Sequence, residues 1–371
     1  MCIPFVEIEA KGSHREIGRQ VGESARELIV AGIAYYEAWH ETMGGPSFAE
    51  AEREGLAYLP FARRSLPRIV EQLEGMAEGA DVALGKLLVP NLGEELTCSA
   101  DPGAPGAVGP HAAASGLPRF AHTEHCTSLG IVTDGHRLLA HNEDWWAGDV
   151  DKNVLLRMTT DDGTEILAMT SACLLPPTGI NSHGIATGGN TLYGNDYRVG
   201  VPNNLIRRAI LEARTLEEAC ERALLPDRAR GSNHTLIDAD GRLWDLETSA
   251  TGHALVRADD RVVHTNHFSA PEMAGFEVST SVGTRHRLAR ARSLLDEGLA
   301  RGDDPRALLT TILADHDGRD DCMSICCHPD ESAPVGERDM TTASMIWDVE
   351  ALTVEVCAGP PCQNERQSFA L

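Results

Sequence analysis

The chain changes its local pattern at Cys126, and this change limits the folds that it can adopt. Before it, apolar side chains recur at helical spacing, whereas after it short apolar runs alternate with Asp-Gly turns. Residues 99–119, between the two parts, are rich in Gly, Pro and Ala and have no periodicity. We therefore expect a helical segment over residues 1–98, a flexible linker over 99–125 and a sheet-rich region over 126–371.

The first part carries recognisable helix start signals. In two of them a Ser is followed three residues later by a Glu, which is the capping-box pattern, and in a third a Pro stands in the first turn. Gly79 is expected to end the third helix. The predicted helix starts lie at Ser13, Ser47, Pro67 and Asp81.

The second part contains recurring hairpin signals. Consecutive hairpins with helices between them favour antiparallel sheets covered by helices, an α+β fold, over a doubly wound parallel sheet. The predicted strand pairs are 128–132 with 137–140, 154–158 with 165–169, 235–237 with 243–246, and 344–349 with 353–356, and another strand is expected at 262–264. Helices are expected around 204–224, 284–298 and 305–314.

Charge and hydropathy exclude two classes of partner. The chain has 32 basic and 56 acidic residues, a net charge of −24, which would repel a nucleic-acid backbone. No apolar run approaches the roughly 20 residues of a membrane helix, and the N-terminus has no basic segment typical of a signal peptide. We expect a cytoplasmic protein with mostly reduced cysteines, because ten cysteines are too few for a disulfide scaffold at this length.

Cys126 is the leading candidate nucleophile because it stands where the linker ends and the first strand begins. If the bond between His125 and Cys126 were cut, the freed α-amine, with a pKa near 8, would lie beside the thiol as a general base. The motif Asn142-Glu143-Asp144-Trp145-Trp146 follows one hairpin later, so Asp144 can orient the amine or thiol.

Other side chains complete the predicted site. Trp145 and Trp146 are expected to line an apolar substrate pocket, which Tyr193 is also expected to border. Asn266, in His264-Thr265-Asn266-His267, carries an amide that can donate to an oxyanion, and Asn190 is a second candidate for that role.

Together these residues resemble the acyl-coenzyme A:6-aminopenicillanic acid acyltransferase family, the C45 peptidases among the N-terminal nucleophile hydrolases. The blocks that carry the resemblance are Lys11-Gly12-Ser13, Glu16-Ile17-Gly18 with Gly22, Glu74-Gly75-Met76-Ala77-Glu78-Gly79-Ala80, Cys126-Thr127-Ser128, Asn142-Glu143-Asp144, Gly179-Ile180-Asn181 with Gly184, Arg207, Gly231-Ser232-Asn233, His264-Thr265-Asn266-His267, Asp315-His316, and Ser324-Ile325-Cys326 with His328-Pro329.

The resemblance implies a four-layer αββα sandwich with a helical N-terminal segment, made as a precursor that cuts itself before Cys126. The two resulting chains stay associated. On this pattern Cys126 is the nucleophile, Asp144 its orienting partner and Asn266 an oxyanion donor or amine-orienting residue. No metal or bound cofactor is implied, although a coenzyme A thioester can serve as acyl donor. Hydrolysis and acyl transfer both stay open, as does homo-oligomerisation.

This chain departs from the family pattern at two positions. His125 stands where the penicillin enzyme has Gly, so its β-carbon can crowd the self-cleavage turn while its imidazole can serve as acid or base. Cys327 stands where the family tends to have Arg after Ser-Ile-Cys, and Arg319 or Arg338 are the candidates to replace that Arg.

Two alternatives to this prediction remain. One is an uncleaved thiol hydrolase whose base is a histidine, and the other is a non-enzymatic binding protein stabilised by metal at Cys322, Cys326, Cys327 and His328. The spacing of that cluster fits no standard zinc finger, which argues against metal. A basic helix face, made of Arg285, Arg287, Arg290 and Arg292, has either a structural role or docks an acidic carrier such as coenzyme A.

The expected substrate is a small N-acyl amine or amino acid. Its partly apolar acyl group would enter the tryptophan pocket, and a neutral or cationic amine would face solvent. The reaction is cleavage or transfer of the acyl group through a Cys126 thioester.

Overall fold

The computed structural model describes residues 3–42, 46–97, 126–133, 135–278, 282–317, 324–333 and 338–371. The predicted linker over 99–125, with His125, and Cys322 lie outside the described residues. The described chain contains both helices and sheets, so the predicted mixed class is confirmed. None of the helices within these ranges is long and apolar enough to cross a membrane.

The N-terminal part is a strand followed by helices. Ser13 and Ser47 each cap a helix through the expected capping box, and Pro67 stands in the first turn of α5. The elements are β1 (Val6–Gly12), α1 (His14–Ser24), α2 (Arg26–Thr42), α3 (Phe48–Leu56), α4 (Leu59–Ser65), α5 (Pro67–Ala80), α6 (Leu84–Asn91) and α7 (Gly93–Thr97).

The remaining elements build two sheets, and helices connect some of their strands along the sequence. The larger sheet has the order β1-β4-β5-β6-β7-β8-β9-β10, and the smaller sheet the order β11-β2-β3-β12-β13-β14. Their strands after β1 are β2 (Thr127–Thr133), β3 (His136–Trp146), β4 (Asn153–Thr160), β5 (Glu165–Ser171), β6 (Gly179–Asn181), β7 (Ile185–Thr191), β8 (Ser232–Asp238), β9 (Leu243–Thr248), β10 (His253–Ala258), β11 (Arg261–His264), β12 (Asp339–Asp348), β13 (Thr353–Ala358) and β14 (Gln367–Ala370). The helices are α8 (Asn203–Ile210), α9 (Leu216–Ala223), α10 (Val282–Arg301) and α11 (Pro305–Leu313), with short 3-10 turns η1 (Ala147–Lys152) and η2 (Pro271–Phe276).

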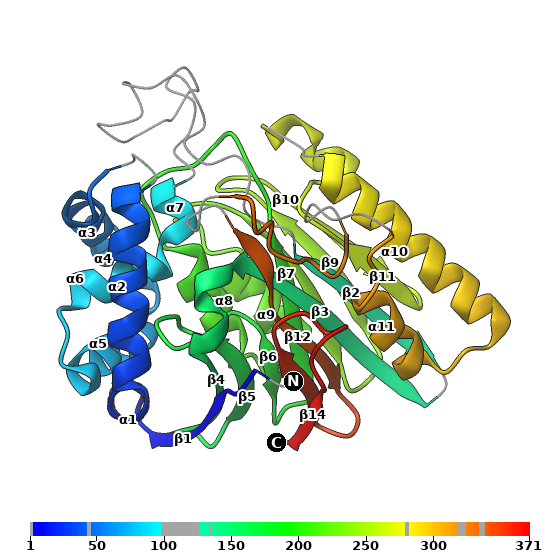
Figure 1. The fold of residues 1–371 in the computed structure, drawn as a ribbon, viewed down its shortest axis with the longest axis horizontal. Helices are drawn as coiled ribbons and strands as arrows, with labels where there is room; N and C mark the ends of the chain where they lie inside the picture. The colour runs from blue at the N-terminus through cyan, green and yellow to red at the C-terminus, as the bar shows by residue number, and fades with distance from the viewer. Residues whose placement is uncertain are drawn as a thin grey trace.

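The two sheets pack face to face and have helices on their outer faces (Figure 1). Side chains alternate between the two faces of a strand, and β3 shows this clearly. Leu139 packs between the sheets with Met345 of β12, whereas Leu138 and Ala140 join the core beneath α10 and α11. Apolar clusters on the outer face of the larger sheet include residues of α1–α6, α8 and α9.

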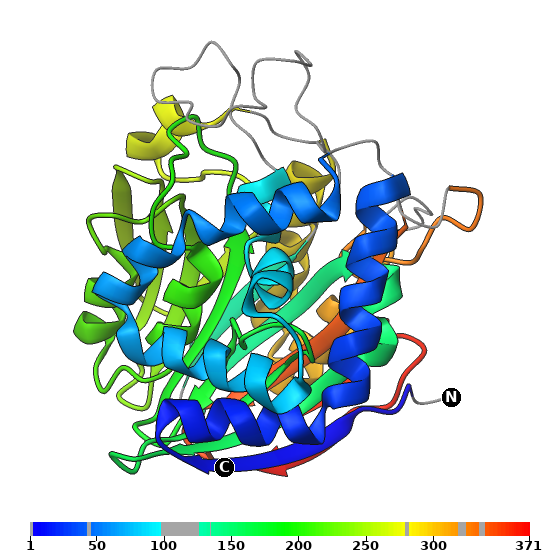
Figure 2. The same ribbon diagram turned by 90° about the vertical axis from the view of Figure 1, so that its left-hand side faces the viewer.

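The N-terminal segment is tied to both sheets. β1 pairs in parallel with β4 at the edge of the larger sheet, and Ile3 forms a bridge with Ala358 at the end of β13. Figure 2 shows the N-terminal helices over one face of the molecule, with β1 along its base. Residues before Cys126 therefore supply both a strand and a helical layer to the sheets that follow.

Close packing of α1 on α5 depends on glycines at the contact. A β-carbon added at Gly18 would lie 1.9 Å from the main-chain oxygen of Gln72, and one at Gly75 would lie 2.2 Å from that of Arg15. Gly22 and Gly79 face equally close backbone atoms. Glycine thus allows the two helix backbones to touch, which explains several glycines of the N-terminal motif blocks.

Three details differ from the sequence predictions. The segment at 6–12 is a strand, because its residues pair with β4 along their whole length. Gly79 lies inside α5 rather than at its end, since its place is fixed by the contact with α1. Asp81 ends α5 in the left-handed conformation, with φ 59°, instead of starting the next helix. The four predicted hairpins are confirmed as β2–β3, β4–β5, β8–β9 and β12–β13.

Candidate active site

The Cys126 thiol lies one residue before β2 and is 3% exposed. Its Sγ is 3.6 Å from Glu143 Oε1 and 3.9 Å from the main-chain oxygen of Asp144. The β2–β3 register pairs Thr127 with Asn142, so the hairpin returns the chain to the thiol as its spacing predicts. The motif on β3 and the candidate nucleophile are therefore neighbours.

Glu143, which sequence reasoning did not single out, is the carboxylate in contact with the thiol. Its Oε2 lies 3.1 Å from His141 Nε2, and His141 Nδ1 lies 2.9 Å from the Ser128 hydroxyl. Burial raises the pKa of Glu143, but His141 and the charge of Arg207 outweigh burial and hold this pKa below its ordinary value. An ionised carboxylate beside a thiol can accept the thiol proton.

The Asp144 carboxyl is held by a neighbouring hydroxyl, while the main-chain oxygen of Asp144 lies 3.9 Å from the thiol. The Thr341 hydroxyl donates to Asp144 Oδ1 at 2.6 Å, and the Cys327 amide donates to the same hydroxyl oxygen at 3.0 Å. Asp144 Oδ2 is buried and has no hydrogen-bond partner among the described residues. Burial raises the pKa of Asp144 well above its ordinary value, partly opposed by Thr341 and the Arg287 guanidinium.

Asn266 lies two residues after the end of β11 and is linked to the thiol through Arg287, whose guanidinium interacts electrostatically with Cys126. Arg287 Nη2 donates to Asn266 Oδ1 at 2.8 Å, and Asn266 Nδ2 donates to the Thr191 carbonyl at 3.3 Å. The amide is thus oriented with its oxygen toward the guanidinium.

Arg287 is a second site residue that sequence reasoning missed. The sequence placed it on a basic helix face of α10, but its side chain is completely buried. Burial lowers its pKa to about 10, opposed by the charges of Asp144, Cys126 and Tyr193. Only the three-dimensional structure distinguishes Arg287 from the other arginines of α10, because Arg285 is exposed and Arg290 pairs with Asp315.

Asn190 on β7 has a buried amide whose oxygen and nitrogen lack hydrogen-bond partners within the described part of the chain. It stands two residues after Gly188, where an added β-carbon would contact the Ser128 hydroxyl of the facing sheet. Side chains two apart share a face of a strand, so Asn190 faces the smaller sheet. A buried amide without partners costs free energy, which makes Asn190 suited to binding a ligand.

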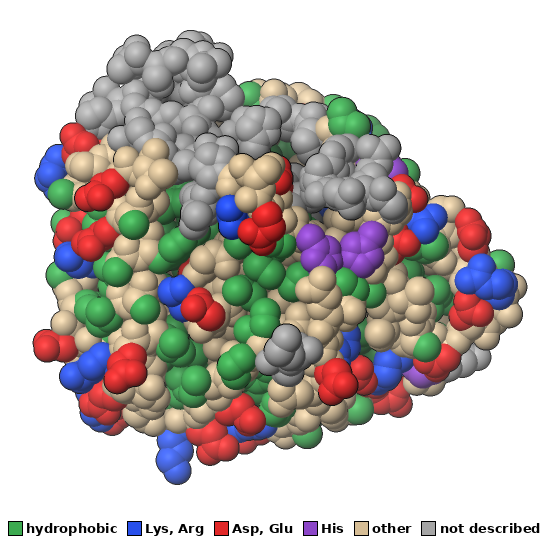
Figure 3. Space-filling view, viewed as in Figure 1, with side chains coloured by type: hydrophobic (Ala, Val, Ile, Leu, Met, Phe, Trp, Pro, Cys, Tyr) green, Lys and Arg blue, Asp and Glu red, His purple; other side chains and the backbone are tan. Residues whose placement is uncertain are grey.

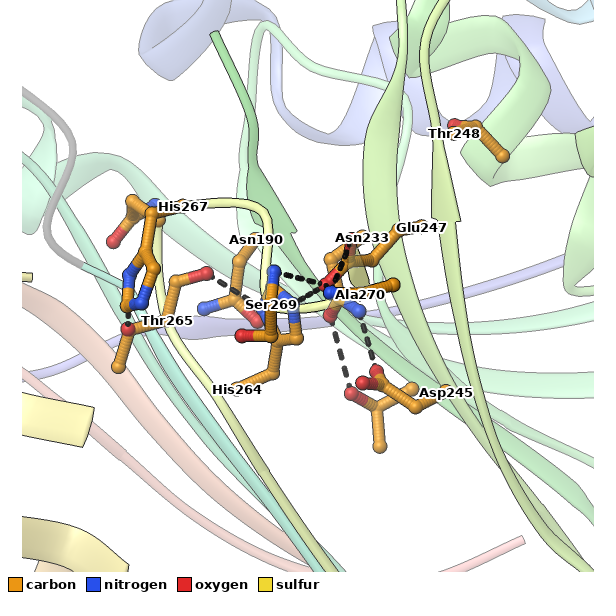
Figure 4. Close-up of polar contacts among 12 residues, drawn as sticks. Asn190, Asn233, Asp245, Glu247, Thr248, His264, Thr265, His267, Ser269 and Ala270 are labelled. Atoms are coloured by element: carbon orange, nitrogen blue, oxygen red, sulfur yellow. Dashed lines mark hydrogen bonds and ion pairs between the residues drawn. The ribbon is translucent and has the colours of Figure 1, made fainter. Parts of the chain in front are cut away.

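A buried polar network supports the loop that carries Asn266 (Figure 4). His264 Nε2 lies 2.9 Å from Glu247 Oε1, and Glu247 accepts hydrogen bonds from the amides of Ser269 and Ala270. Burial lowers the pKa of His264, but Asp245 and Glu247 outweigh it and raise the pKa above its ordinary value. The charged pair fixes both ends of the loop from His264 to Ala270.

A cavity of about 70 Å³ lies between the N-terminal helices and the sheets, and Glu143, the carboxylate in contact with the thiol, is part of its wall. Trp145 lines it, with its indole Nε1 donating to the Tyr36 hydroxyl at 3.1 Å. Its charged lining residues are Glu94, Glu95, Glu143, Asp149 and Arg207. The cavity wall therefore combines residues from before and after Cys126.

The other predicted pocket residues lie elsewhere. Trp146 is buried in the core, where its ring is 4.3 Å from that of Trp39, and it is absent from the described lining of this cavity. Tyr193 is half-buried after β7 and interacts electrostatically with Arg287. Of the two arginines named as replacements for the family Arg, Arg338 pairs with Glu331 at the surface and Arg319 lies outside the described residues.

Two groups of side chains at the site contain metal-binding residue types. Cys126, His141 and Glu143 form one group, and Asp245, Glu247 and His264 form the other. In both groups a carboxylate already lies within hydrogen-bonding distance of an imidazole. These hydrogen bonds account for the side-chain positions without an ion.

Comparisons with known proteins identify the family of the chain. Residues 132–361 match the model of the family described as acyl-coenzyme A:6-aminopenicillanic acid acyl-transferase. No curated protein matches the chain. A mutant conjugated bile acid hydrolase from Clostridium perfringens has a TM-score of 0.44 at 11% identity, over 66% of this chain and 97% of that one. Penicillin V acylase from Agrobacterium tumefaciens has a TM-score of 0.41 at 11% identity, over 63% of this chain and 82% of that one.

Because the family model covers more than half of the sequence, the chain belongs to the acyl-coenzyme A:6-aminopenicillanic acid acyl-transferase family.

Proposed function

We propose that the protein is a cysteine N-terminal nucleophile amidohydrolase or acyltransferase that forms a thioester on Cys126. The observation that carries the proposal is the buried Cys126 thiol in contact with Glu143, with the Asn266–Arg287 pair beside it. Two packed sheets with helices on both outer faces support the further inference that the fold is the αββα sandwich of these hydrolases.

The proposed maturation cuts the His125–Cys126 peptide bond. The Cys126 thiol attacks the His125 carbonyl and gives its proton to a base, which passes the proton to the amide nitrogen as this leaves as the α-amine of Cys126. Water then hydrolyses the resulting thioester, which frees the thiol and leaves a carboxylate at His125. Glu143 is placed to take the thiol proton in the uncut chain. The freed α-ammonium would then be a partner for Asp144 Oδ2, which is buried without one among the described residues.

In turnover, the same thiol attacks the carbonyl carbon of an amide substrate. The α-amine or Glu143 accepts the thiol proton and returns it to the leaving amine as the carbon–nitrogen bond breaks. The amides of Asn266 and Asn190 donate to the oxyanion, and Arg287 holds Asn266 in position. Water or an amine then takes the acyl group, so hydrolysis and transfer share one intermediate.

The two chains produced by cleavage would remain together. β1 is hydrogen-bonded to β4 along seven residue pairs, and the N-terminal helices share an apolar core with the larger sheet. The cavity is lined by residues from before and after the proposed cleavage site, so the N-terminal chain also contributes to the proposed substrate pocket. The protein is proposed to act in the cytoplasm without a bound cofactor, with a coenzyme A thioester as one acyl donor.

The substrate proposed is a small N-acyl amine or amino acid. Trp145 offers an apolar surface for the acyl group, and the excess of acidic over basic side chains in the lining favours an amine that is neutral or positively charged. Burial raises the pKa of Glu95 to about 7 and that of Asp149 to about 6, so these carboxyls can donate or accept hydrogen bonds near neutral pH.

Intact mass and turnover test this proposal together. The purified protein is expected to consist of two chains, the second beginning at Cys126, and to hydrolyse members of a panel of N-acyl amides. Cys126→Ala should remain one folded, inactive chain, whereas Cys220→Ala, on α9 away from the site, should mature and turn over normally. Turnover by Cys126→Ala at the normal rate would refute the mechanism. Active wild-type protein that remains one chain would instead favour the uncleaved thiol hydrolase, with His141 behind Glu143 as the nearby imidazole.

A further inference from the structure

A second cluster of reactive side chains lies behind the site, where the chain leaves α11 and where it leaves β13. It consists of four residues that each offer one nitrogen or sulfur atom, and these atoms all lie within 4.8 Å of one another: His316, Cys326, His328 and Cys362. His316 follows α11, Cys326 and His328 precede β12, and Cys362 follows β13. Segments far apart in the sequence therefore supply two thiols and two imidazoles to one place.

The contacts of His328 are more numerous than hydrogen bonding can satisfy. Its Nε2 lies 2.9 Å from His316 Nε2, 3.1 Å from Cys362 Sγ and 3.7 Å from Cys326 Sγ. An imidazole nitrogen carries one hydrogen or one lone pair, so it makes one well-directed hydrogen bond. A cation at the centre of the four atoms would instead interact favourably with all of them.

We propose that His316, Cys326, His328 and Cys362 bind a Zn²⁺ ion in a tetrahedral structural site. Zinc binds sulfur at about 2.3 Å and imidazole nitrogen at about 2.0–2.1 Å, which places neighbouring ligand atoms about 3.3–3.8 Å apart in a tetrahedron. The distance from His328 Nε2 to Cys326 Sγ, 3.7 Å, is within this range, and those to His316 Nε2 and Cys362 Sγ, 2.9 and 3.1 Å, are somewhat shorter. Four protein ligands leave no open position for substrate, which is the pattern of a structural rather than a catalytic zinc site.

The set differs from the cluster that the sequence suggests. Cys322 lies outside the described residues, and the Cys327 sulfur is 3.6 Å from the Asp339 carbonyl rather than in the group. His316 and Cys362 lie ten residues before and 36 residues after Cys326, a separation that no finger motif has. Only the fold brings the four ligands together.

The proposed ion would support the candidate active site without taking part in its chemistry. The Ile325 carbonyl accepts a hydrogen bond from the Asn142 side chain at 2.9 Å. The amide of Cys327 holds Thr341, which in turn holds Asp144. A metal that holds Cys326 and His328 would therefore also hold Ile325 and Cys327 in place. The main chains of these two residues contact Asn142 and Thr341 and so help to position β3 beside Cys126.

Metal content of the full-length protein tests the site independently of any enzymatic activity. Protein produced with zinc in the medium is expected to contain one Zn²⁺ per chain by elemental mass spectrometry. Cys362→Ser and His316→Ala should each lose most of it. Cys362 is exposed, so its variant should fold normally, as circular dichroism can verify. Cys220→Ser, which changes a cysteine outside the cluster, should keep the full zinc content.

Cobalt provides the second readout. Reduced, chelator-treated protein titrated with Co²⁺ should develop the intense thiolate-to-metal absorption of a tetrahedral site, and Cys362→Ser should weaken it. The proposal is overturned if reduced protein takes up neither metal or if Cys362→Ser retains the wild-type zinc content. A disulfide between Cys326 and Cys362 in freshly purified protein would also overturn it.

Discussion

Asn190 and Asn266 differ in how their side-chain amides are held. Asn266 has its oxygen bonded to Arg287 and its nitrogen to the Thr191 carbonyl, so its orientation is fixed before substrate arrives. Asn190 is buried with neither amide atom bonded to a described residue. The resting protein thus bears an energetic cost at Asn190 that a bound oxyanion could relieve.

We predict opposite effects of Asn190→Leu on activity and stability. The change should lower kcat by about 10²–10³, the usual loss for one oxyanion donor. It should leave the melting temperature unchanged or raise it, because leucine removes an unsatisfied buried amide. Steady-state kinetics and calorimetry measure the two effects, with exposed Asn195→Ala as the control. A loss of stability with normal kcat would assign Asn190 a structural role.

Asn266→Ala should also reduce kcat by about 10²–10³ if its amide donates to the oxyanion. Arg287 would then lose its hydrogen-bond acceptor at Asn266, so some loss of stability is expected as well. Steady-state kinetics over a range of substrate concentrations measure kcat and KM separately. A rise confined to KM would reassign Asn266 to substrate binding and leave Asn190 and main-chain amides as the oxyanion donors.

At the scale of elements, hairpins and helices were predictable because their signals are local. Asp-Gly turns and alternating apolar residues identified β2–β3, and the Ser-to-Glu capping boxes identified the starts of α1 and α3. β1 was not predictable, since its strand conformation depends on pairing with β4, more than 140 residues away. At the site, Cys126 and Asn266 were proposed from motifs, which are local signals as well.

The contacts of Glu143 and Arg287 could not be read from the motif. Glu143 follows Asn142 on β3 and could be recognised as close to the thiol only from the hairpin register. Arg287 belongs to a helix rich in arginine, and nothing in its sequence spacing distinguishes the buried one. Long-range packing decides both positions.

Helix packing gives the prediction at this scale. Gly75→Ala should lower the free energy of unfolding by about 1–3 kcal/mol, the usual cost of overpacking, because its β-carbon would lie 2.2 Å from the Arg15 main-chain oxygen. Denaturant unfolding measures the change. Gly275→Ala is the control, because an added β-carbon there meets no described atom within 4 Å. Equal stabilities of the two variants would refute close α1–α5 contact.

At the scale of the whole molecule, acidic groups dominate the charge balance. The net charge is −24, although acidic and basic side chains are interspersed on the face in Figure 3. Several carboxyls are buried as well. Burial and the neighbouring Asp144 raise the pKa of Asp339 to about 8, and burial raises that of Glu95 to about 7. These groups bind protons more tightly in the folded than in the unfolded protein.

Stability is therefore expected to fall as pH rises through these pKa values. A carboxyl with an unfolded pKa near 4 and a raised folded pKa contributes fully below pH 4 and loses its contribution as pH rises through the folded value. Asp339→Asn, which cannot ionise, should make the melting temperature less dependent on pH between about 4 and 8. An unchanged pH dependence in this variant, measured by calorimetry, would contradict the proposed protonation of Asp339.

The central claim is that the Cys126 thiol carries the acyl group during turnover. The direct measurement is mass spectrometry of protein quenched in acid after brief mixing with N-acyl amides, p-nitrophenyl acyl esters or acyl-coenzyme A. We expect one acyl group on the chain that begins at Cys126, located at that residue by peptide mapping and absent from Cys126→Ala. An acyl group on another residue in protein that is turning over, or undiminished acylation of Cys126→Ala, would contradict the account.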